Sequence, residues 1–304
     1  MNELALAIDV GATKVAVGLV TREGAVLSRA DISSQADSML ELNQRLSHAI
    51  SQQLSQAPSS VVGVGIGSAG PIDHLKGTIN PVNISKWVDF SLVDFVRTSS
   101  GIDDVHLIGD ASALAYAEFC VGAGQGAKNL LGVVVSTGIG GGTVLDGKFF
   151  PGALGNAGFI GHTVVIMDGD LCACGARGCV EAYASGTNMA RSAQMERFED
   201  VAEAARVGNK NAIAVIDKGA RVLATALVNA VATMDLDTIV VGGGVINAAD
   251  VYWQPLQTHF ETQVECLKFP SRVALKRATL GKDSGLIGAG LVGFISANQS
   301  EGAM

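Results

Sequence analysis

One glycine-rich stretch, residues 152–186, concentrates the metal-binding side chains of this chain. Its candidate ligands are one imidazole and three thiols: His162, Cys172, Cys174 and Cys179. This is the ligand set of a closed tetrahedral zinc site, and it leaves no open position for an activated water. Gly175 and Gly178 allow the chain to double back between the thiols. The sequence therefore predicts a structural zinc ion. Buried thiols or a disulfide fit less well, because three of the five cysteines fall within eight residues of a segment unsuited to a packed core.

A loop held by a metal ion would also fix its neighbours. Glu181 follows Cys179 by two residues, and the second ring nitrogen of His162 stays free to hydrogen-bond outward. A carboxylate and an imidazole N–H on a rigid loop can hold a polyhydroxylated small molecule. Taken alone, however, Glu181 is better explained as an acid at the N-terminus of a helix that begins in VEAYASG.

The chain is long enough, at 304 residues, for two domains that share a cleft. Its net charge of −8 and the absence of a Lys/Arg stripe argue against nucleic acid as a partner. A phosphate ligand would then be attracted locally, by backbone N–H groups and a metal ion.

Nothing in the pattern of apolar residues predicts a targeting segment or a membrane span. The chain does not open on a signal peptide, and its most apolar run, residues 130–145, is interrupted by hydroxyl residues and glycines. The thiolates of the zinc site, together with Cys120 and Cys266 as unpaired core residues, indicate a reducing cytoplasm.

Two similar segments each predict a strand, a glycine and hydroxyl turn, and a second strand. In the first, strands 4–10 and 15–20 flank the turn that contains Gly11, Thr13 and Lys14. Such a turn can cradle a phosphate, although it lacks the spacing of a Walker loop. The second begins with strand 130–135 and forms a weak internal repeat with the first. Two such hairpins facing each other across a cleft could grip the phosphates of one nucleotide.

Periodicity predicts the remaining elements. The expected strands cover residues 25–32, 61–66, 105–109 and 238–241, and the expected helices cover 39–54, 92–98, 111–119, 198–206, 211–218, 220–233 and 285–296. Asp110 lies between a strand and a helix, where a carboxylate is either catalytic or an N-cap. Residues 242–244, three glycines after a strand, form either a tight turn or a surface for a purine or ribose.

Seven motifs resemble those of the ROK family of sugar kinases and sugar-responsive repressors, and the match extends over about residues 4–296. In order they are DVGATK, GIGSAGPID, IGDASALAYAE, VSTGIGGG, GNAGFIGH, CACGARGCVEAYASG and IVVGGGVI. The most specific is the Gly-His pair followed by C-x-C-G-x-x-G-C-x-E. The resemblance implies an actin-like ATPase (ribonuclease H-like) fold with two α/β domains around a cleft. The expected boundaries are 1–115 plus 285–304 for the first domain and 116–284 for the second.

The resemblance also implies a role for each matching residue. The ATP-binding positions would be Asp9, Gly11, Thr13, Lys14, Thr137, Gly138, Gly140, Gly242, Gly243 and Gly244. The sugar-contacting positions would be Gly70, Asn83, Asp110, His162 and Glu181, with Asp110 also the general base. The implied cofactors are structural Zn²⁺ and Mg²⁺ with ATP, and the implied assembly is a homodimer.

Two positions depart from the family pattern and bear on the substrate. Gly109 stands where the family has Asn, and Phe159 stands where it has Glu or, in some N-acetylmannosamine kinases, His. The protein can then form fewer hydrogen bonds to sugar hydroxyls, and the apolar ring of Phe159 suits the methyl group of an acylamino substituent. Together with the IGHT and GCVEA-ASG wording, this favours phosphorylation of an N-acylhexosamine, foremost N-acetylmannosamine at its 6-hydroxyl. The alternatives are a glucokinase or a kinase of an unusual hexose or aminosugar.

Two further classes of function compete with a kinase. A sugar-sensing repressor of this family carries a helix-turn-helix ahead of the fold, and the first phosphate motif here begins at Asp9, which leaves no room for one. A non-catalytic sugar-binding protein would accord with Gly109 and Phe159. The sequence favours the kinase.

Overall fold

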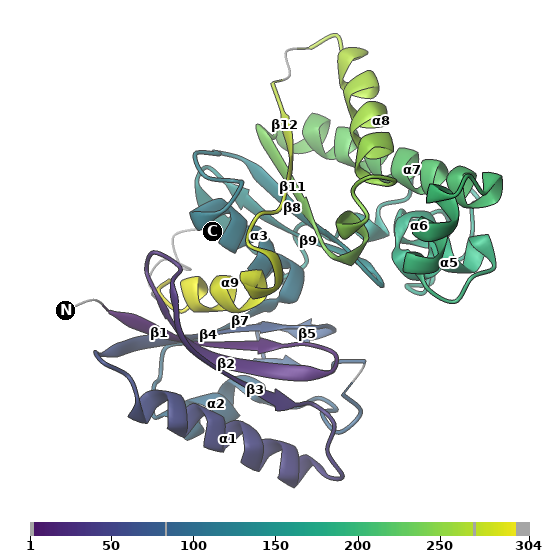
Figure 1. Cartoon of the computed structure of the whole chain (residues 1–304). Coiled ribbons are helices and arrows are strands. Elements are labelled where there is room, and N and C mark those ends of the chain that lie inside the picture. The colour runs from purple at the N-terminus through teal and green to yellow at the C-terminus, as the bar shows by residue number, and fades with distance from the viewer. Residues whose placement is uncertain (1–2, 83, 270–271, 296–304) are drawn as a thin grey trace. The chain divides into compact units, whose positions relative to one another are not determined.

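The structure is a computed structural model that describes residues 3–82, 84–269 and 272–295 (Figure 1). The chain forms two compact units. The first comprises Met1–Gly122, Pro151–Ala157 and Leu280–Met304, and the second comprises Ala123–Phe150 and Gly158–Thr279.

Each unit is built on a five-stranded sheet with the same connectivity. The first sheet has the order β3-β2-β1-β4-β7 and the second the order β10-β9-β8-β11-β12. In each, three strands form an antiparallel meander, a fourth strand adds in parallel to the first strand of that meander, and a fifth adds in parallel to the fourth. The predicted repeat of residues 4–20 and 130–145 is therefore confirmed, and it extends to the whole sheets.

The strands of the first sheet are β1 (Leu4–Val10), β2 (Lys14–Thr21), β3 (Val26–Ser33), β4 (Val61–Ser68) and β7 (Val105–Gly109). Those of the second are β8 (Leu130–Val135), β9 (Ile139–Leu145), β10 (Lys148–Phe150), β11 (Thr238–Gly242) and β12 (Ala274–Arg277). A separate pair, β5 (Ile72–Asp73) and β6 (Thr78–Ile79), follows β4. The short strands β5, β6, β10 and β12 were not predicted, since none shows a clear alternation of apolar and polar residues.

Helices cover both faces of the first sheet (Figure 1). They are α1 (Met39–Ser55) and α2 (Leu92–Ser100) on one face, and α3 (Asp110–Val121) and α9 (Ser284–Val292) on the other. Leu42, Leu46 and Ile50 of α1 are fully buried at a spacing of four residues, which explains why that helix was predictable. Helix α9 packs against β1, β2 and β4 so closely that a Cβ at Gly65 would overlap the carbonyl of Ala289.

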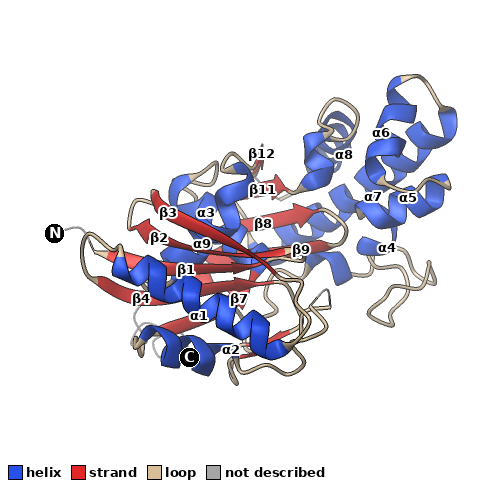
Figure 2. Ribbon diagram, turned by 60° about the horizontal axis from the view of Figure 1, so that its bottom comes forward, coloured by secondary structure: helices blue, strands red, loops and turns tan. Residues whose placement is uncertain are grey.

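The helices of the second unit gather beside its sheet (Figure 2). They are α4 (Glu181–Ala184), α5 (Gly186–Ala193), α6 (Phe198–Arg206), α7 (Lys210–Met234) and α8 (Trp253–Glu265). The prediction of two helices, 211–218 and 220–233, was wrong: α7 runs unbroken through Gly219. A Cβ at Gly219 would stand 2.8 Å from Met189 Sδ, so the glycine there permits close packing and does not end the helix.

Three short 3₁₀ helices complete the described structure: η1 (Ile160–His162), η2 (Gly244–Asn247) and η3 (Gly281–Asp283). Helix α9 ends at Val292, short of the predicted 296. Cys266 is exposed at the end of α8, so its assignment to the core was wrong, whereas Cys120 is partly buried. Among the helices described, none is both long and apolar enough to cross a membrane.

Candidate active site and metal centre

Three parallel strands of the first unit end side by side. The register pairs Val10 of β1 with Ser68 of β4, and Ser68 with Gly109 of β7. The backbone N–H of Ala69 donates to the carbonyl of Val10 at 2.9 Å, which continues this pairing past the strand ends. Three of the predicted site residues, Asp9, Gly70 and Asp110, therefore lie at or just beyond the carboxyl edge of one sheet, where α/β folds place their ligands.

Asp110 is the first residue of α3, and Gly109 is the N-cap, so the N-cap alternative for Asp110 was wrong. The Asp110 carboxylate accepts a hydrogen bond from the backbone N–H of Ala111 at 2.7 Å. Solvent reaches part of this side chain, but the protein around it removes enough hydration to raise the pKa of the carboxyl.

Asp9 faces the charge of Asp110. Loss of hydration, and then repulsion from Asp110, raise the pKa of Asp9 to about 6, against the opposing pull of Arg29 and Lys14. The Asp9 carboxylate also lies against Gly285, the second residue of α9, where a Cβ would stand 2.8 Å from its oxygen. Two neighbouring acids that both have raised pKa values are typical of a functional site.

The first glycine hairpin is closed by a hydrogen bond within its own backbone. It is also held by Ser34, the residue that follows β3. Gly11 N–H donates to the carbonyl of Lys14 at 3.0 Å. Ser34 donates through its backbone N–H to Thr13 O at 3.2 Å and through its hydroxyl to Ala12 O at 3.0 Å. These hydrogen bonds hold the backbone of the turn, and so they fix the positions from which the Thr13 and Lys14 side chains project.

Lys14 belongs to a row of charges that the sequence analysis missed. Its Nζ contacts Asp31 at 3.1 Å, Arg29 contacts the same carboxylate at 2.8 Å, and Arg29 also reaches Asp283 at 2.6 Å. Partial loss of hydration raises the pKa of Asp31, but hydrogen bonds and charge attraction from Arg29 and Lys14 outweigh it and lower this pKa overall. These partners lie up to 254 residues apart, so no local spacing could have indicated them.

The second glycine hairpin, between β8 and β9, is held on both sides by the segment after the cysteines. Ser136 carbonyl accepts from Gly186 N–H at 2.7 Å, and Ile139 N–H donates to Glu181 Oε2 at 2.8 Å. Thr137 and Gly138 form the tip of the turn, and Gly140 follows in β9 opposite Val134.

The triple glycine lies beside this hairpin. Gly242 ends β11, and Gly243 adopts a φ of 101°, a value that favours glycine. A Cβ at Gly243 would overlap the backbone of Val135, whereas one at Gly244 would stand 3.6 Å from Ser136 Oγ. The predicted second phosphate motif and the predicted adenosine motif are thus neighbours in the second unit.

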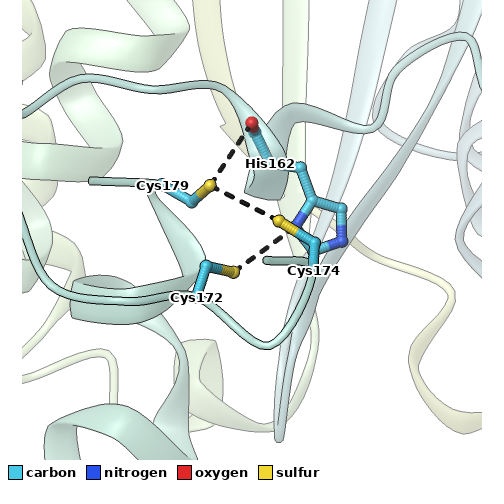
Figure 3. Close-up of side chains that lie close together, drawn as sticks. All are labelled: His162, Cys172, Cys174 and Cys179. Atoms are coloured by element: carbon cyan, nitrogen blue, oxygen red, sulfur yellow. Dashed lines mark hydrogen bonds between the residues drawn. The ribbon is translucent and has the colours of Figure 1, made fainter. Parts of the chain in front are cut away.

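The four predicted metal ligands converge (Figure 3). All four ligand atoms lie within 4.8 Å of one another. Cys172 Sγ is 3.7 Å from His162 Nδ1, and Cys174 Sγ is 3.7 Å from Cys179 Sγ. Bonds of about 2.3 Å at tetrahedral angles would separate two zinc-bound sulfurs by about 3.8 Å, so the cluster fits a zinc ion. The sulfur separation excludes a disulfide.

The surroundings of the cluster shift the pKa values of two of its thiols in opposite directions. A hydrogen bond from the backbone N–H of Ala176 lowers the pKa of Cys174, and burial raises the pKa of Cys179 to about 12. Because Nδ1 of His162 faces the sulfurs, Nε2 is the nitrogen that points away from them (Figure 3).

The loop that carries the cysteines is itself pinned. Tyr183 hydroxyl accepts from Asp170 N–H at 2.6 Å. Gly178 has a φ of 79°, and a Cβ there would overlap the carbonyl of Ile166. Gly175 has a φ of 94°. The two glycines that were predicted to reverse the chain therefore do so.

The two unusual positions differ in their surroundings. Phe159 is 45% exposed and presents its ring edge-on to His162, with 6.3 Å between ring centroids. At Gly109, a Cβ would meet only Ser112 Oγ, at 3.8 Å, so that position has space for a side chain. Asn83, a predicted sugar contact, lies outside the described residues.

Comparison with known proteins agrees with this arrangement. The two sheets have the same connectivity, and in each a glycine turn joins the first two strands along the chain. This arrangement defines an α/β protein of the actin-like ATPase fold. The model of the ROK family matches residues 5–292, and the chain belongs to that family.

Three similar proteins are kinases. A glucokinase from Halalkalibacterium halodurans is 33% identical and aligns over 93% of this chain and 92% of its own length. An N-acetylmannosamine kinase from Yersinia pestis is 35% identical, over 94% of this chain and 97% of its own length. The solved structure of a ROK hexokinase from Thermus thermophilus has a TM-score of 0.89 and 31% identity and covers 99% of this chain and 100% of its own. The chain is accordingly an enzyme of the kinase class.

Proposed function

We propose that this enzyme transfers the γ-phosphoryl group of ATP to a hydroxyl of a hexose or N-acylhexosamine, with Asp110 as the general base. The observation that carries the proposal is the position of Asp110 at the carboxyl edge of the first sheet, at the end of β7, with Asp9 and the first glycine hairpin at the same edge on β1, two strands away. Phosphoryl transfer requires in-line positioning, neutralisation of phosphate charge and a base near the attacking hydroxyl.

The nucleotide would be held mainly by backbone groups. Glycine hairpins suit this task because N–H groups can approach phosphate oxygens where no Cβ intervenes. In the first unit the proposed positions are Asp9, Gly11, Thr13 and Lys14. In the second they are Thr137, Gly138, Gly140, Gly242, Gly243 and Gly244, of which the last three would receive the adenosine. Mg²⁺ would arrive with ATP, and Asp9 would be the carboxylate that faces it.

Asp110 has the chemistry of a general base. A carboxyl whose pKa is raised by lost hydration holds a proton more firmly than an exposed one, and it is still ionised at neutral pH when its pKa lies below 7. It can therefore accept the proton of the attacking hydroxyl as the bond to phosphorus forms.

The sugar would be recognised by His162, Glu181, Gly70 and Asn83 together with Asp110. His162 would bind zinc through Nδ1, which fixes the ring and leaves Nε2 for a sugar hydroxyl. Phe159, partly exposed beside His162, offers an apolar ring edge that suits an acyl methyl group. N-acetylmannosamine, phosphorylated at the 6-hydroxyl, is the substrate that these features favour, and glucose is the alternative.

A zinc ion held by His162, Cys172, Cys174 and Cys179 would have a structural role. All four positions of a tetrahedral ion would be taken by protein atoms, so this ion would orient His162 and Glu181 and would not touch the reacting groups.

The test is a coupled assay of ADP release with ATP and Mg²⁺ over a panel of hexoses and N-acylhexosamines. We expect the highest kcat/KM with N-acetylmannosamine. Higher kcat/KM with glucose would assign the enzyme as a glucokinase. No turnover with any sugar, despite measurable sugar binding, would refute the proposed kinase activity.

A further inference from the structure

The carboxylate of Glu181 is committed to the backbone of the second glycine hairpin. Its Oε2 accepts a hydrogen bond from Ile139 N–H at 2.8 Å. At Gly138, the preceding residue, a Cβ would stand 2.8 Å from the same oxygen, so the carboxylate occupies the space that a side chain would need. Glu181 therefore contacts the hairpin directly, in addition to any contact with a sugar.

A second hydrogen bond holds the other end of the same turn. Gly186 N–H donates to the carbonyl of Ser136 at 2.7 Å. Residues 181–186 thus hold the turn 136–139 at both of its ends. Backbone N–H groups bind phosphates well only when their directions are fixed beforehand, because the cost of ordering them would otherwise reduce the affinity.

The segment that makes both hydrogen bonds is itself held by side-chain hydrogen bonds. Asn188 donates through Nδ2 to the carbonyl of Glu181 at 2.7 Å and to Ser185 Oγ at 2.8 Å. Ser185 caps α5 by accepting from Asn188 N–H at 3.3 Å. The corner between α4 and α5 is therefore closed by one asparagine, and the Glu181 side chain projects from a fixed base.

This segment begins directly after the last cysteine of the metal cluster. Cys179 is fully buried, its carbonyl accepts from Ala182 N–H at 3.1 Å, and Val180 N–H donates to Thr163 O at 3.0 Å. His162, the imidazole ligand, immediately precedes Thr163. The segment between Cys179 and the residues that contact the hairpin is therefore short and held by hydrogen bonds along its length.

We propose that Glu181 is a positioning residue for the hairpin 136–139, through which the metal-bound loop orients the phosphates of the nucleotide. The proposal rests on the proposed function, since it takes this hairpin as a phosphate site. It extends that function because it gives the zinc loop an effect on nucleotide binding in the absence of sugar. A residue that only contacts sugar would have no such effect.

The experiment measures binding of a nonhydrolysable ATP analogue with Mg²⁺ to the full chain, without sugar, by calorimetry. Glu181→Ala should weaken binding by about tenfold to hundredfold, since it removes a charge-assisted hydrogen bond that orients the hairpin. Glu181→Gln keeps an acceptor oxygen for Ile139 N–H and should recover most of the affinity. Glu199→Ala, a change of an exposed acid in α6, is the matched control, and zinc content is measured for every variant.

Gly138→Ala provides an independent readout. The added methyl group would press on Glu181 Oε2, so its effect on nucleotide affinity should be smaller in the Glu181→Ala background than in the wild type. Equal nucleotide affinity of wild type and Glu181→Ala, or strict additivity of the two changes, would overturn the inference. A wild-type chain that binds no nucleotide would instead refute the proposed function.

Discussion

The carboxylate of Glu118, inside α3, accepts a hydrogen bond from the backbone N–H of Leu280 at 2.9 Å. Leu280 is where the chain re-enters the first unit, and Gly122, one turn after Glu118, is where the chain leaves it. Gly122 N–H donates to the carbonyl of Glu118 at 3.1 Å, and the carboxylate leaves no room for a Cβ at Gly122. Glu118 is fully buried. Its carboxylate holds the segment that begins at Leu280, and its main-chain carbonyl holds the segment that ends at Gly122.

Replacement of this acid should destabilise the protein. Glu118→Ala leaves the part-buried N–H of Leu280 without this acceptor, and we expect the free energy of unfolding to fall by about 1–3 kcal/mol. Glu118→Gln keeps an acceptor and should cost less. Denaturant titration measures both, with Glu199→Ala as an exposed control expected within about 0.5 kcal/mol of wild type. A Glu118→Ala chain as stable as this control would show that the contact contributes nothing.

Asp9 should make stability depend on pH. Its pKa is about 6 in the fold against 3.8 ordinarily, so the native state binds the proton more tightly than the unfolded state. Stability from this group is therefore present below pH 4 and is lost as the pH rises to about 6. Asp9→Asn should be more stable than wild type by about 1–3 kcal/mol above pH 7, with no difference below pH 4, and it should lose activity. Melting curves across this pH range test it, and a pH-independent difference contradicts it.

The cysteine cluster should bind one zinc ion per chain. Cys179→Ser replaces a fully buried ligand, so we expect its metal content to fall well below that of wild type and its thermal midpoint to drop. Elemental analysis of the purified chain, before and after a chelator, gives the stoichiometry. Cys266→Ser is the control, because this exposed thiol lies in α8's C-cap outside the cluster. Equal zinc in both variants, or none in wild type, would contradict the assignment.

Asp110→Asn should lower kcat by about 10²–10⁴, the usual contribution of a positioned base. The change keeps the size of the side chain and its acceptor for Ala111 N–H, so folding and zinc content should be nearly unchanged. Steady-state kinetics with ATP and the best sugar of the panel measure kcat and KM separately. Near-wild-type kcat would remove Asp110 from the role of base.

Gly109→Asn should add a hydrogen bond from the protein to a sugar hydroxyl. The position is an N-cap, where Gly and Asn are both favoured, and a Cβ would meet only Ser112 Oγ at 3.8 Å. We expect KM for hexoses to fall by about fivefold to tenfold through one added hydrogen bond, with unchanged stability. Gly101→Asn, a C-cap with no atom near its Cβ position, is the matched control. An unchanged KM would show that residue 109 does not contact the sugar.

Local patterns in the sequence were sufficient for much of the fold. Helix α6 was predicted with its bounds and α1 to within one residue, because their apolar positions recur at helical spacing. The boundary predicted at Gly219 failed for a physical reason, since close packing against Met189 outweighs the low helix propensity of glycine. The short strands β10 and β12 depend on pairing with neighbours, which local sequence does not record.

The sequence by itself determined the cluster of one imidazole and three thiols and the two glycine hairpins, because ligand chemistry and the freedom of glycine belong to residue types at short spacings. Only the tertiary structure decided which distant groups face each other. The register of strands and the packing of helices bring Asp9 near Asp110, whose charge repels it, and Lys14 into an ion pair with Asp31. They also bring Glu181 to the backbone N–H of Ile139, which donates a hydrogen bond to its carboxylate. Such contacts join residues 17 to 101 positions apart, and they form because folding brings backbone and charge together in ways that no local pattern encodes.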